Sequence, residues 1–266
     1  MYRWLVAPYA DSLCRQQIDT IVFVPDGPLR TIPIAALHDG TAFLVEKYGV
    51  AVIPGLQLVD PKPLPRKGAK VLIAGVSEAV LGQVALDAVK SELGEVQKIY
   101  SVRPLLNEEF TKSRLEREMN QTEPSQVHIA SHAQFTGDPR TSWIQAYNDR
   151  ISISELSDMV RFAKFRETPL ELLVLSACET AAGDERAALG LSGVALRAGA
   201  RSALGSLWAV SDAAAAKLIP GFYQALQTPG VSRAMALSLA QRELLKTRQF
   251  RHPFYWSPFL LIGAWF

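Results

Sequence analysis

The chain has 266 residues, of which 48% are hydrophobic and 20% are charged. This balance is typical of a soluble globular chain, and a chain of this length folds as one large α/β domain or two small ones without a disulfide or a metal ion. The formal net charge is +2 and the lysines and arginines are scattered, which argues against nucleic acid or an anionic membrane as the main partner.

The first sixty residues hold few strong secondary-structure signals. Residues 21–24 (Ile21–Val24) form an apolar, strand-like run, and Pro25–Pro28 after it is a turn signal. Residues 43–53 predict a hairpin or an extended segment. The proline-rich stretch Pro61–Gly68 is typical of a linker. We therefore expect an N-terminal subdomain, residues 1–60, that extends the sheet of a second unit, residues 69–266.

The second unit alternates strand-like apolar runs with amphipathic helices, which indicates an α/β fold with a mostly parallel sheet. Several strands are near-continuous apolar runs, as expected when helices cover both faces of the sheet. The predicted strands are Lys70–Gly75, Gln126–Ser131, Glu171–Ala177, Arg201–Leu207 and Pro258–Ile262. The predicted helices are Ala85–Tyr100, Thr111–Met119, Glu185–Ala198, Asp212–Leu226 and Ser232–Thr247.

The two cysteines, Cys14 and Cys178, form no Cys-x-x-Cys pair, and no His/Cys cluster has metal-ligand spacing, so we expect no structural zinc. The first eight residues lack the apolar core and cleavage site of a signal peptide. The apolar stretch 254–266 is much shorter than the ~20 residues that a membrane span needs. We expect a cytoplasmic protein that does not span a membrane.

Two residues at the ends of predicted strands suggest a catalytic pair. Cys178 closes the apolar run 172–177, and His132 closes the run 127–131. If the two strands are parallel neighbours, both residues reach the edge of the sheet where open α/β sheets bind their ligands. An imidazole beside a thiol lowers the pKa of the thiol and later protonates a leaving amine. A buried, unreactive Cys178 and a structural His132 are the alternative interpretation.

These two runs carry a family resemblance. Val127–His132 (VHIASH) and Leu175–Thr180 (LSACET) resemble the two motifs of the CHAT domain, a caspase-like module related to separase. The resemblance covers most of the chain, through Pro25–Leu29 with Ile32–Pro33 and Ala36–Leu37, Gly199–Arg201 through Ser206–Asp212, Phe222–Tyr223, and His252–Pro253 with Tyr255–Trp256.

The resemblance implies a three-layer α/β/α caspase-haemoglobinase fold and a thiol peptidase that needs no metal or organic cofactor. By position, Cys178 would be the nucleophile and His132 the base. The backbone N–H groups of Cys178 and Ala133 would hold the oxyanion. The family usually has glycine where this chain has Ala133, and alanine resists positive φ. The loop 184–188 also departs from the family pattern. Neither change removes a catalytic atom.

Other residues are weaker candidates. Trp208 and Asp212 follow a predicted strand, where caspase-like enzymes build the pocket for the residue before the scissile bond. A carboxylate there favours a basic substrate side chain, and an N-cap role for the next helix fits equally well. His128 is expected to make a structural hydrogen bond. Ser176 and Thr180 could bond around the thiol, and Ser142 and Asp149 match family positions that serve either packing or substrate.

The leading hypothesis is therefore a cysteine endopeptidase that cleaves protein substrates through a Cys178 thioester, with His132 as base and then acid. One alternative is a catalytically weak caspase-like signalling or scaffold module that binds proteins. Another is a different acyl-transfer enzyme on a flavodoxin-like sheet. Domains of the family resemble C-terminal modules behind tetratricopeptide repeats, so we expect an excised domain controlled by such repeats or by a regulatory partner.

Overall fold

The computed structural model describes residues 1–55, 68–136, 138, 141–163, 170–180 and 199–266, with the backbone alone described at 161–163 and 177–180. The predicted helix 185–198 and the loop 184–188 lie outside the described residues, and so does the proline-rich stretch 61–68 apart from its last residue.

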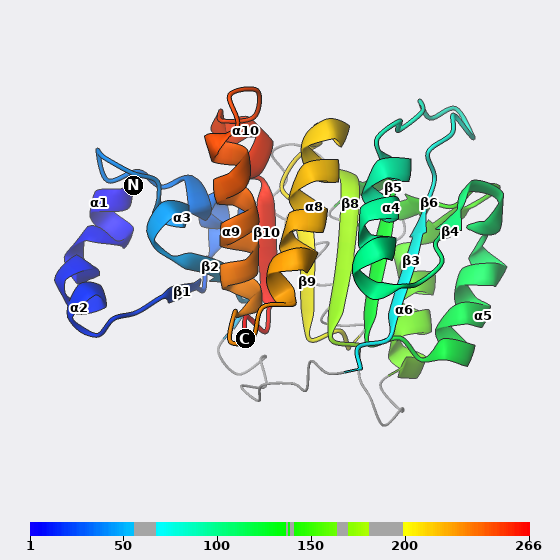
Figure 1. Ribbon diagram of the computed structural model, residues 1–266, viewed down its shortest axis with the longest axis horizontal. Coiled ribbons are helices and arrows are strands. Elements are labelled where there is room, and N and C mark those ends of the chain that lie inside the picture. The colour runs from blue at the N-terminus through cyan, green and yellow to red at the C-terminus, as the bar shows by residue number, and fades with distance from the viewer. Residues whose placement is uncertain (56–67, 137, 139–140, 164–169, 181–198) are drawn as a thin grey trace.

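The described strands form one sheet, in the order β1-β2-β10-β9-β8-β5-β3-β4 (Figure 1). Strands β6 and β7 lie off this path, with β6 paired to both β5 and β7. The strands are β1 (Thr20–Phe23), β2 (Gly49–Val52), β3 (Val71–Gly75), β4 (Leu105–Leu106), β5 (Gln126–Phe135), β6 (Trp143–Gln145), β7 (Arg150–Ser152), β8 (Leu172–Thr180), β9 (Ser202–Ser206) and β10 (Phe259–Gly263).

The sheet consists of two parallel blocks that run in opposite directions. Strands β4, β3, β5, β8 and β9 are parallel to one another. Strands β1, β2 and β10 form the second block, which is joined to the first through the antiparallel pair β9–β10. The sheet is therefore mostly parallel, and the N-terminal strands β1 and β2 belong to it. A boundary between two subdomains stays a prediction.

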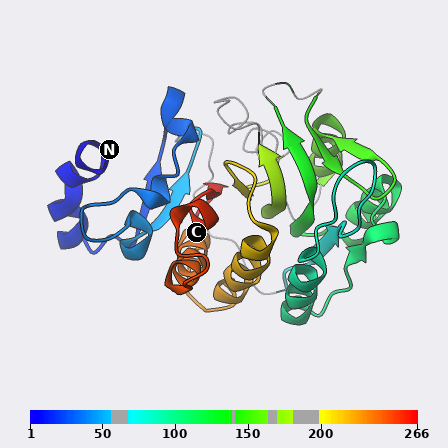
Figure 2. The ribbon, with the colours of Figure 1, turned by 90° about the horizontal axis from the view of Figure 1, so that it is seen from above.

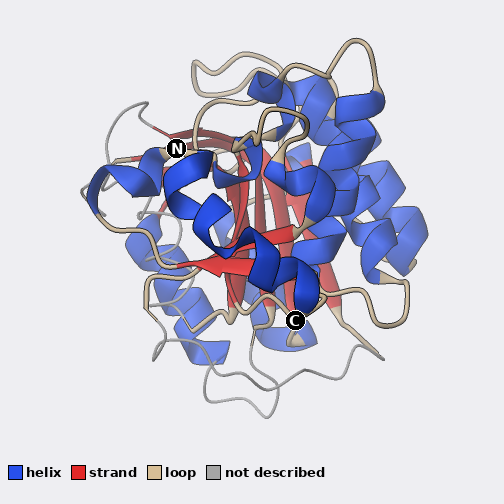
Figure 3. Ribbon diagram, turned by 90° about the vertical axis from the view of Figure 1, so that its left-hand side faces the viewer, coloured by secondary structure: helices blue, strands red, loops and turns tan. Residues whose placement is uncertain are grey.

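Helices cover both faces of the sheet (Figure 3). They are α1 (Tyr2–Leu5), α2 (Ala10–Arg15), α3 (Leu44–Lys47), α4 (Val89–Tyr100), α5 (Lys112–Thr122), α6 (Ile153–Ala163), α8 (Asp212–Leu226), α9 (Arg233–Lys246) and α10 (Pro253–Trp256). Helices α4, α8 and α9 form a row along one face, and α5 and α6 pack on the other (Figure 2).

The core follows this layering because alternate strand residues point to opposite faces. On β5, Ala130 packs in the cluster beneath α4, α8 and α9, whereas Val127 and Ile129 pack in the cluster beneath α5 and α6. The same alternation separates Val174 from Leu173 on β8. Both central strands are therefore buried on both faces, as their continuous apolar runs predict.

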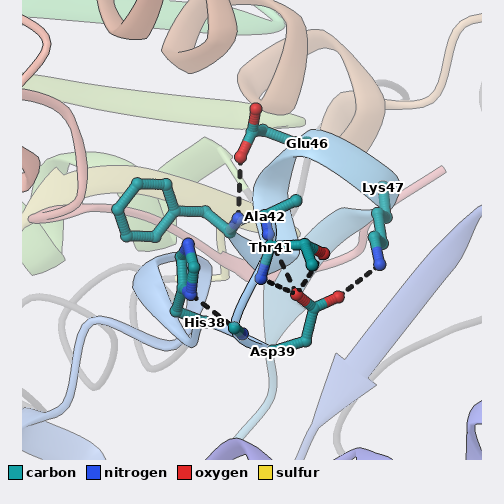
Figure 4. A network of polar contacts seen from close by, with 8 residues as sticks. His38, Asp39, Thr41, Ala42, Glu46 and Lys47 are labelled. Atoms are coloured by element: carbon teal, nitrogen blue, oxygen red, sulfur yellow. Dashed lines mark hydrogen bonds and ion pairs between the residues drawn. The ribbon is translucent and has the colours of Figure 1, made fainter.

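The prediction of a hairpin or extended segment at residues 43–53 is wrong in part. Residues 44–47 form the short helix α3, and β2 after it runs parallel to β1. A hairpin within 43–53 needs two antiparallel strands there, and this segment holds only the strand β2. The carboxylate of Glu46 accepts the Phe43 N–H at 2.7 Å, which favours the first turn of α3 over an extended chain (Figure 4).

A polar loop before α3 ties the N-terminal segment to the C-terminal one. The Asp39 carboxylate accepts the Thr41 and Ala42 N–H groups at 2.7 and 2.9 Å and pairs with Lys47 (Figure 4). These contacts, that with Lys47 first, hold the pKa of Asp39 well below its usual range. The loop presents the Phe43 ring edge-on to Trp256, with the ring centroids 5.1 Å apart.

Candidate active site

The strands that carry the predicted catalytic pair are parallel neighbours. Strand β5 pairs with β8, and Ala133 faces Cys178 across the ladder. Both strands are longer than predicted, so His132 and Cys178 lie within their last few residues rather than just beyond them. The backbone of Cys178 is thus opposite the residue that follows His132. The Cys178 side chain lies outside the described part of the chain.

The pairing of β5 with β8 changes register beside the predicted site. Ala130 faces Ser176 and the next facing pair is Ala133 with Cys178, so β5 advances by three residues where β8 advances by two. Such bulges bend a strand and re-aim a side chain, and they are common next to active sites. His132 lies inside this shift. No sequence pattern indicated it.

The His132 ring is held by a backbone carbonyl. The residue is 9% exposed, and its Nε2 lies 2.8 Å from the oxygen of Val84, in the loop between β3 and α4. A carbonyl oxygen only accepts, so Nε2 carries the hydrogen. In the neutral imidazole the lone pair is then on Nδ1. Val84 was not identified from the sequence, because a backbone group is invisible in a side-chain pattern.

Asp212 interacts electrostatically with this histidine and does not cap its own helix. It is the first residue of α8, whose N-cap is Ser211, and its Oδ2 accepts the Ala88 N–H at the start of α4 at 2.7 Å. The N-cap interpretation for α8 is therefore wrong. Burial raises the pKa of Asp212, the carboxylates Glu92 and Asp87 raise it further, and the Ala88 bond and His132 oppose the shift.

Trp208 follows β9 and is partly exposed. Its indole N–H donates to the Phe254 carbonyl at 3.3 Å, and the two rings stack with centroids 6.2 Å apart. Phe254 is 49% exposed. The segment after β9 therefore carries an aromatic surface, at Trp208 in the loop, and a carboxylate, at Asp212 in the first turn of α8.

A buried polar cluster lies between α4 and the two central strands. The Glu92 carboxylate is 2.8 Å from His128 Nε2 and accepts the Ser176 hydroxyl at 3.1 Å. All three residues are buried. Glu92 was missed, although the apolar face of α4 formed by Val89, Leu93 and Val96 includes it, and a charged residue on such a face is a usable signal.

Two weaker candidates support local structure. Ser142 is buried, and its hydroxyl accepts the Thr136 N–H at 2.9 Å. Asp149 is exposed at the turn between β6 and β7, and its carboxylate accepts the Arg150 N–H at 2.7 Å. These contacts are those of packing and turn residues. The side chain of Thr180 lies outside the described residues.

The described ranges contain no group of three or more His, Cys, Asp or Glu side chains arranged to hold a metal ion. Within the same ranges, no helix has both the length and the apolar character needed to cross a membrane.

Comparisons with known proteins identify relatives along nearly the whole chain. The family model described as the CHAT domain matches residues 1–264. Tetratricopeptide repeat protein 28 of Homo sapiens is 24% identical over an alignment of 321 residues, which covers 99% of this chain and 13% of that protein. The Mus musculus protein of the same name is 23% identical over the same shares. The chain thus spans 13% of the length of these curated relatives.

Solved structures show the same fold. The chain is similar to the Saccharomyces cerevisiae separase–securin complex, with a TM-score of 0.58 and 17% identity over 93% of this chain and 16% of that chain. It is also similar to the complex of the Porphyromonas gingivalis RgpB pro- and mature domains, with a TM-score of 0.50 and 9% identity over 73% of this chain and 47% of that chain. At these identities the likeness shows the fold, and the predicted caspase-type α/β fold is confirmed.

Proposed function

Because the chain belongs to the CHAT domain family, we propose that it is a cysteine endopeptidase with Cys178 as nucleophile and His132 as general base. The observation that carries the proposal is the facing pair Ala133–Cys178 on neighbouring parallel strands. It brings the nucleophile's backbone beside the strand residue that follows the base. The buried setting of His132 and its bond to Val84 support a ring held in one orientation.

The tautomer of His132 suggests the direction of proton transfer. With Nε2–H donated to Val84, Nδ1 takes the proton of the Cys178 thiol, and the thiolate attacks the scissile carbonyl carbon. The tetrahedral intermediate collapses to a thioester as the imidazolium protonates the leaving amine. His132 then activates the water that hydrolyses the thioester. No metal ion or organic cofactor is required for these steps.

Backbone N–H groups have to stabilise the oxyanion, and we propose those of Cys178 and Ala133 as the candidate donors. Ala133 faces Cys178 on β8 and Ile144 on β6, whereas the described pairing of β8 with β9 ends at Val174, so the Cys178 N–H is the stronger candidate donor of the two. One such donor is worth about 3–4 kcal/mol of barrier. Ala133 does not have a positive φ, so its replacement of the family's glycine introduces no backbone strain.

We propose that the loop after β9 and the first turn of α8 bind the substrate residue before the scissile bond. Asp212 supplies a half-buried carboxylate near His132, and Trp208 supplies an aromatic surface. A carboxylate in such a pocket favours arginine or lysine, because a substrate without a cation leaves the buried group unpaired. Catalysis through a thiol also requires that Cys178 stay reduced, which suits the cytoplasm.

The second candidate is a protein-binding scaffold module of the same fold. The specific observation in its favour is that the curated relatives are tetratricopeptide repeat proteins, of which this chain spans a small part. Repeats or another protein partner could then regulate the site or use its surface. An acyloxymethyl ketone activity-based probe that carries arginine separates the two. Labelling at Cys178 that is lost in His132→Ala supports the peptidase, and no labelling of the folded native chain supports the scaffold.

A further inference from the structure

Two residues of the sequence motifs have no part in the proposed chemistry, and one helix residue joins them. His128 lies four residues before His132 on β5, and Ser176 lies two residues before Cys178 on β8. Both bond to the carboxylate of Glu92 on α4, at 2.8 and 3.1 Å. Glu92 and His128 are 0% exposed and Ser176 is 1% exposed.

Glu92 bonds the two strands just before they change register. His128 faces Val174, and Ala130 faces Ser176, which is the last facing pair before the shift that contains His132. One carboxylate therefore links β5 to β8 from the face covered by α4. Beyond this point the extra residue of β5 disrupts the regular ladder, so the relative position of the two strand ends depends more on side chains.

The same helix is connected to His132 through its N-terminal end. Val84, four residues before Ala88, accepts the His132 ring hydrogen, and the Ala88 N–H at the start of α4 is held by Asp212. Helix α4 and the loop before it thus contact β5, which carries His132, β8, which carries Cys178, and helix α8. Glu92 is the contact that fixes α4 to both strands at once.

We propose that Glu92, with His128 and Ser176, is a positioning residue that sets the geometry between His132 and Cys178, an inference that rests on the proposed peptidase function. The carboxylate suits this role because it accepts from both strands, and bonds to a charged acceptor are stronger than neutral ones. Misplacing reacting groups by about 1 Å can cost 100-fold in rate. Loosening the link should therefore lower turnover while substrate binding is retained.

The surroundings of the cluster identify the other groups that a change at Glu92 affects. On α8, Asp212 interacts electrostatically with Glu92, and the Tyr223 ring stacks on His128 with centroids 5.6 Å apart. Tyr100 of α4 lies edge-on to Tyr223. Within the described residues, no lysine or arginine forms an ion pair with Glu92.

The test compares Glu92→Gln and Ser176→Ala with Glu95→Gln as the matched control. Glu95 is on the same helix, but it is exposed and pairs only with Lys98 in the described structure. Glutamine keeps the shape of Glu92 and one acceptor oxygen, so this variant should fold, and Ser176→Ala removes a single hydroxyl. We expect kcat to fall 10- to 100-fold in both test variants with KM changed less than twofold, and native values in Glu95→Gln.

The pH profile of Cys178 alkylation by iodoacetamide is the readout that a merely structural residue would not move. We expect the profile to shift toward higher pH in both test variants while cooperative thermal unfolding persists. Folded test variants with native kcat and a native profile would overturn the proposal.

Hydrogen–deuterium exchange separates this inference from the proposed peptidase function. If the native chain cuts no peptide and Cys178 reacts no faster than the exposed Cys14, the peptidase proposal fails. In that case exchange at residues 128–135 and 172–180 still decides the role of Glu92. Exchange at least tenfold faster there in Glu92→Gln, with residues 49–52 unchanged, supports it, and native protection in all variants refutes it.

Discussion

Replacing His132 with alanine removes one buried ring whose recorded hydrogen bond is the one to Val84. A bond of this kind contributes about 0.5–1.5 kcal/mol net. Val84 is 71% exposed in the loop between β3 and α4, and we expect its freed carbonyl to bond to water after the change. With the lost ring contacts, we expect a cost of about 1–2 kcal/mol, which is small against the ~5–15 kcal/mol of a typical domain. The variant should therefore fold.

The effect on Cys178 should be much larger than the effect on stability. An unperturbed thiol has a pKa of about 8.5, so roughly 1% is thiolate at pH 6.5. Thiols activated by a neighbouring imidazolium have pKa values of about 7.5 or lower, which gives roughly 9% or more at that pH. Alkylation of Cys178 at pH 6.5 should therefore be about tenfold slower in His132→Ala, and peptide cleavage should be lost.

The assay alkylates the folded protein with iodoacetamide between pH 5.5 and 9 and reads both cysteines by mass spectrometry. Cys14 is exposed on α2 and serves as an internal reference in every sample. Cys178→Ala confirms the site of labelling. If the ratio of Cys178 to Cys14 labelling at pH 6.5 is the same in the native chain and in folded His132→Ala, the catalytic pair is wrong.

Four further predictions concern other parts of the structure. Asp212→Asn keeps an acceptor for the Ala88 N–H and should lose selectivity for basic peptides in a library; unchanged selectivity would contradict the pocket. Burial raises the pKa of Asp212 in the folded chain, so the stability that this group contributes is complete below its unfolded pKa and is lost as pH rises through the folded pKa. At pH 7 the Tm of Asp212→Asn should therefore be higher than that of the native chain. The difference in Tm should disappear in acid. Tyr223→Phe removes a buried hydroxyl without a partner among the described residues and should change the unfolding free energy by between zero and about +1 kcal/mol in urea; a loss above 1 kcal/mol would reveal a missed bond. Gly75→Ala places a Cβ 2.5 Å from the Ala130 carbonyl oxygen and should lower Tm strongly. The Cβ of Gly94→Ala in α4 meets nothing within 4 Å, so this variant should stabilise the fold by about 0.5–1 kcal/mol. Similar Tm changes in the two variants would refute the packing argument.

Helices α8 and α9 could be predicted closely because their ends are set by local chemistry, whereas α4 begins four residues later than predicted and α6 was not predicted. The predicted bounds of Asp212–Leu226 are those of α8. Helix α9 begins one residue later than predicted, since the Ser232 hydroxyl caps it by accepting the Met235 N–H at 3.1 Å. The predicted strands were also found, with each end within four residues of the prediction, whereas the short strands β4, β6 and β7 were not predicted. Apolar runs bounded by turns are enough to identify buried strands.

The arrangement of the site could not be predicted to the same depth, because it depends on contacts between distant residues. Strands β5 and β8 are neighbours because of the strand order of the sheet, and no local sequence pattern indicates the register shift between them. Val84 acts through its backbone, and the direction of the Asp212 carboxylate depends on where α4 begins. The sequence indicated which residues carry the chemistry, and the fold determines what orients them.

The place of β10 has a consequence for how the chain is made. This strand lies between β2 and β9, so β1 and β2, the earliest described strands in sequence, join the rest of the sheet through the latest one. Domains usually begin to fold from the N-terminus during synthesis, at about 5–20 residues per second. Until residues 259–263 are synthesised, the edge of β2 that pairs with β10 has no partner strand. Nascent chains of this type should therefore depend on chaperones that shield strand edges, and premature termination before β10 should yield aggregates rather than a smaller folded domain.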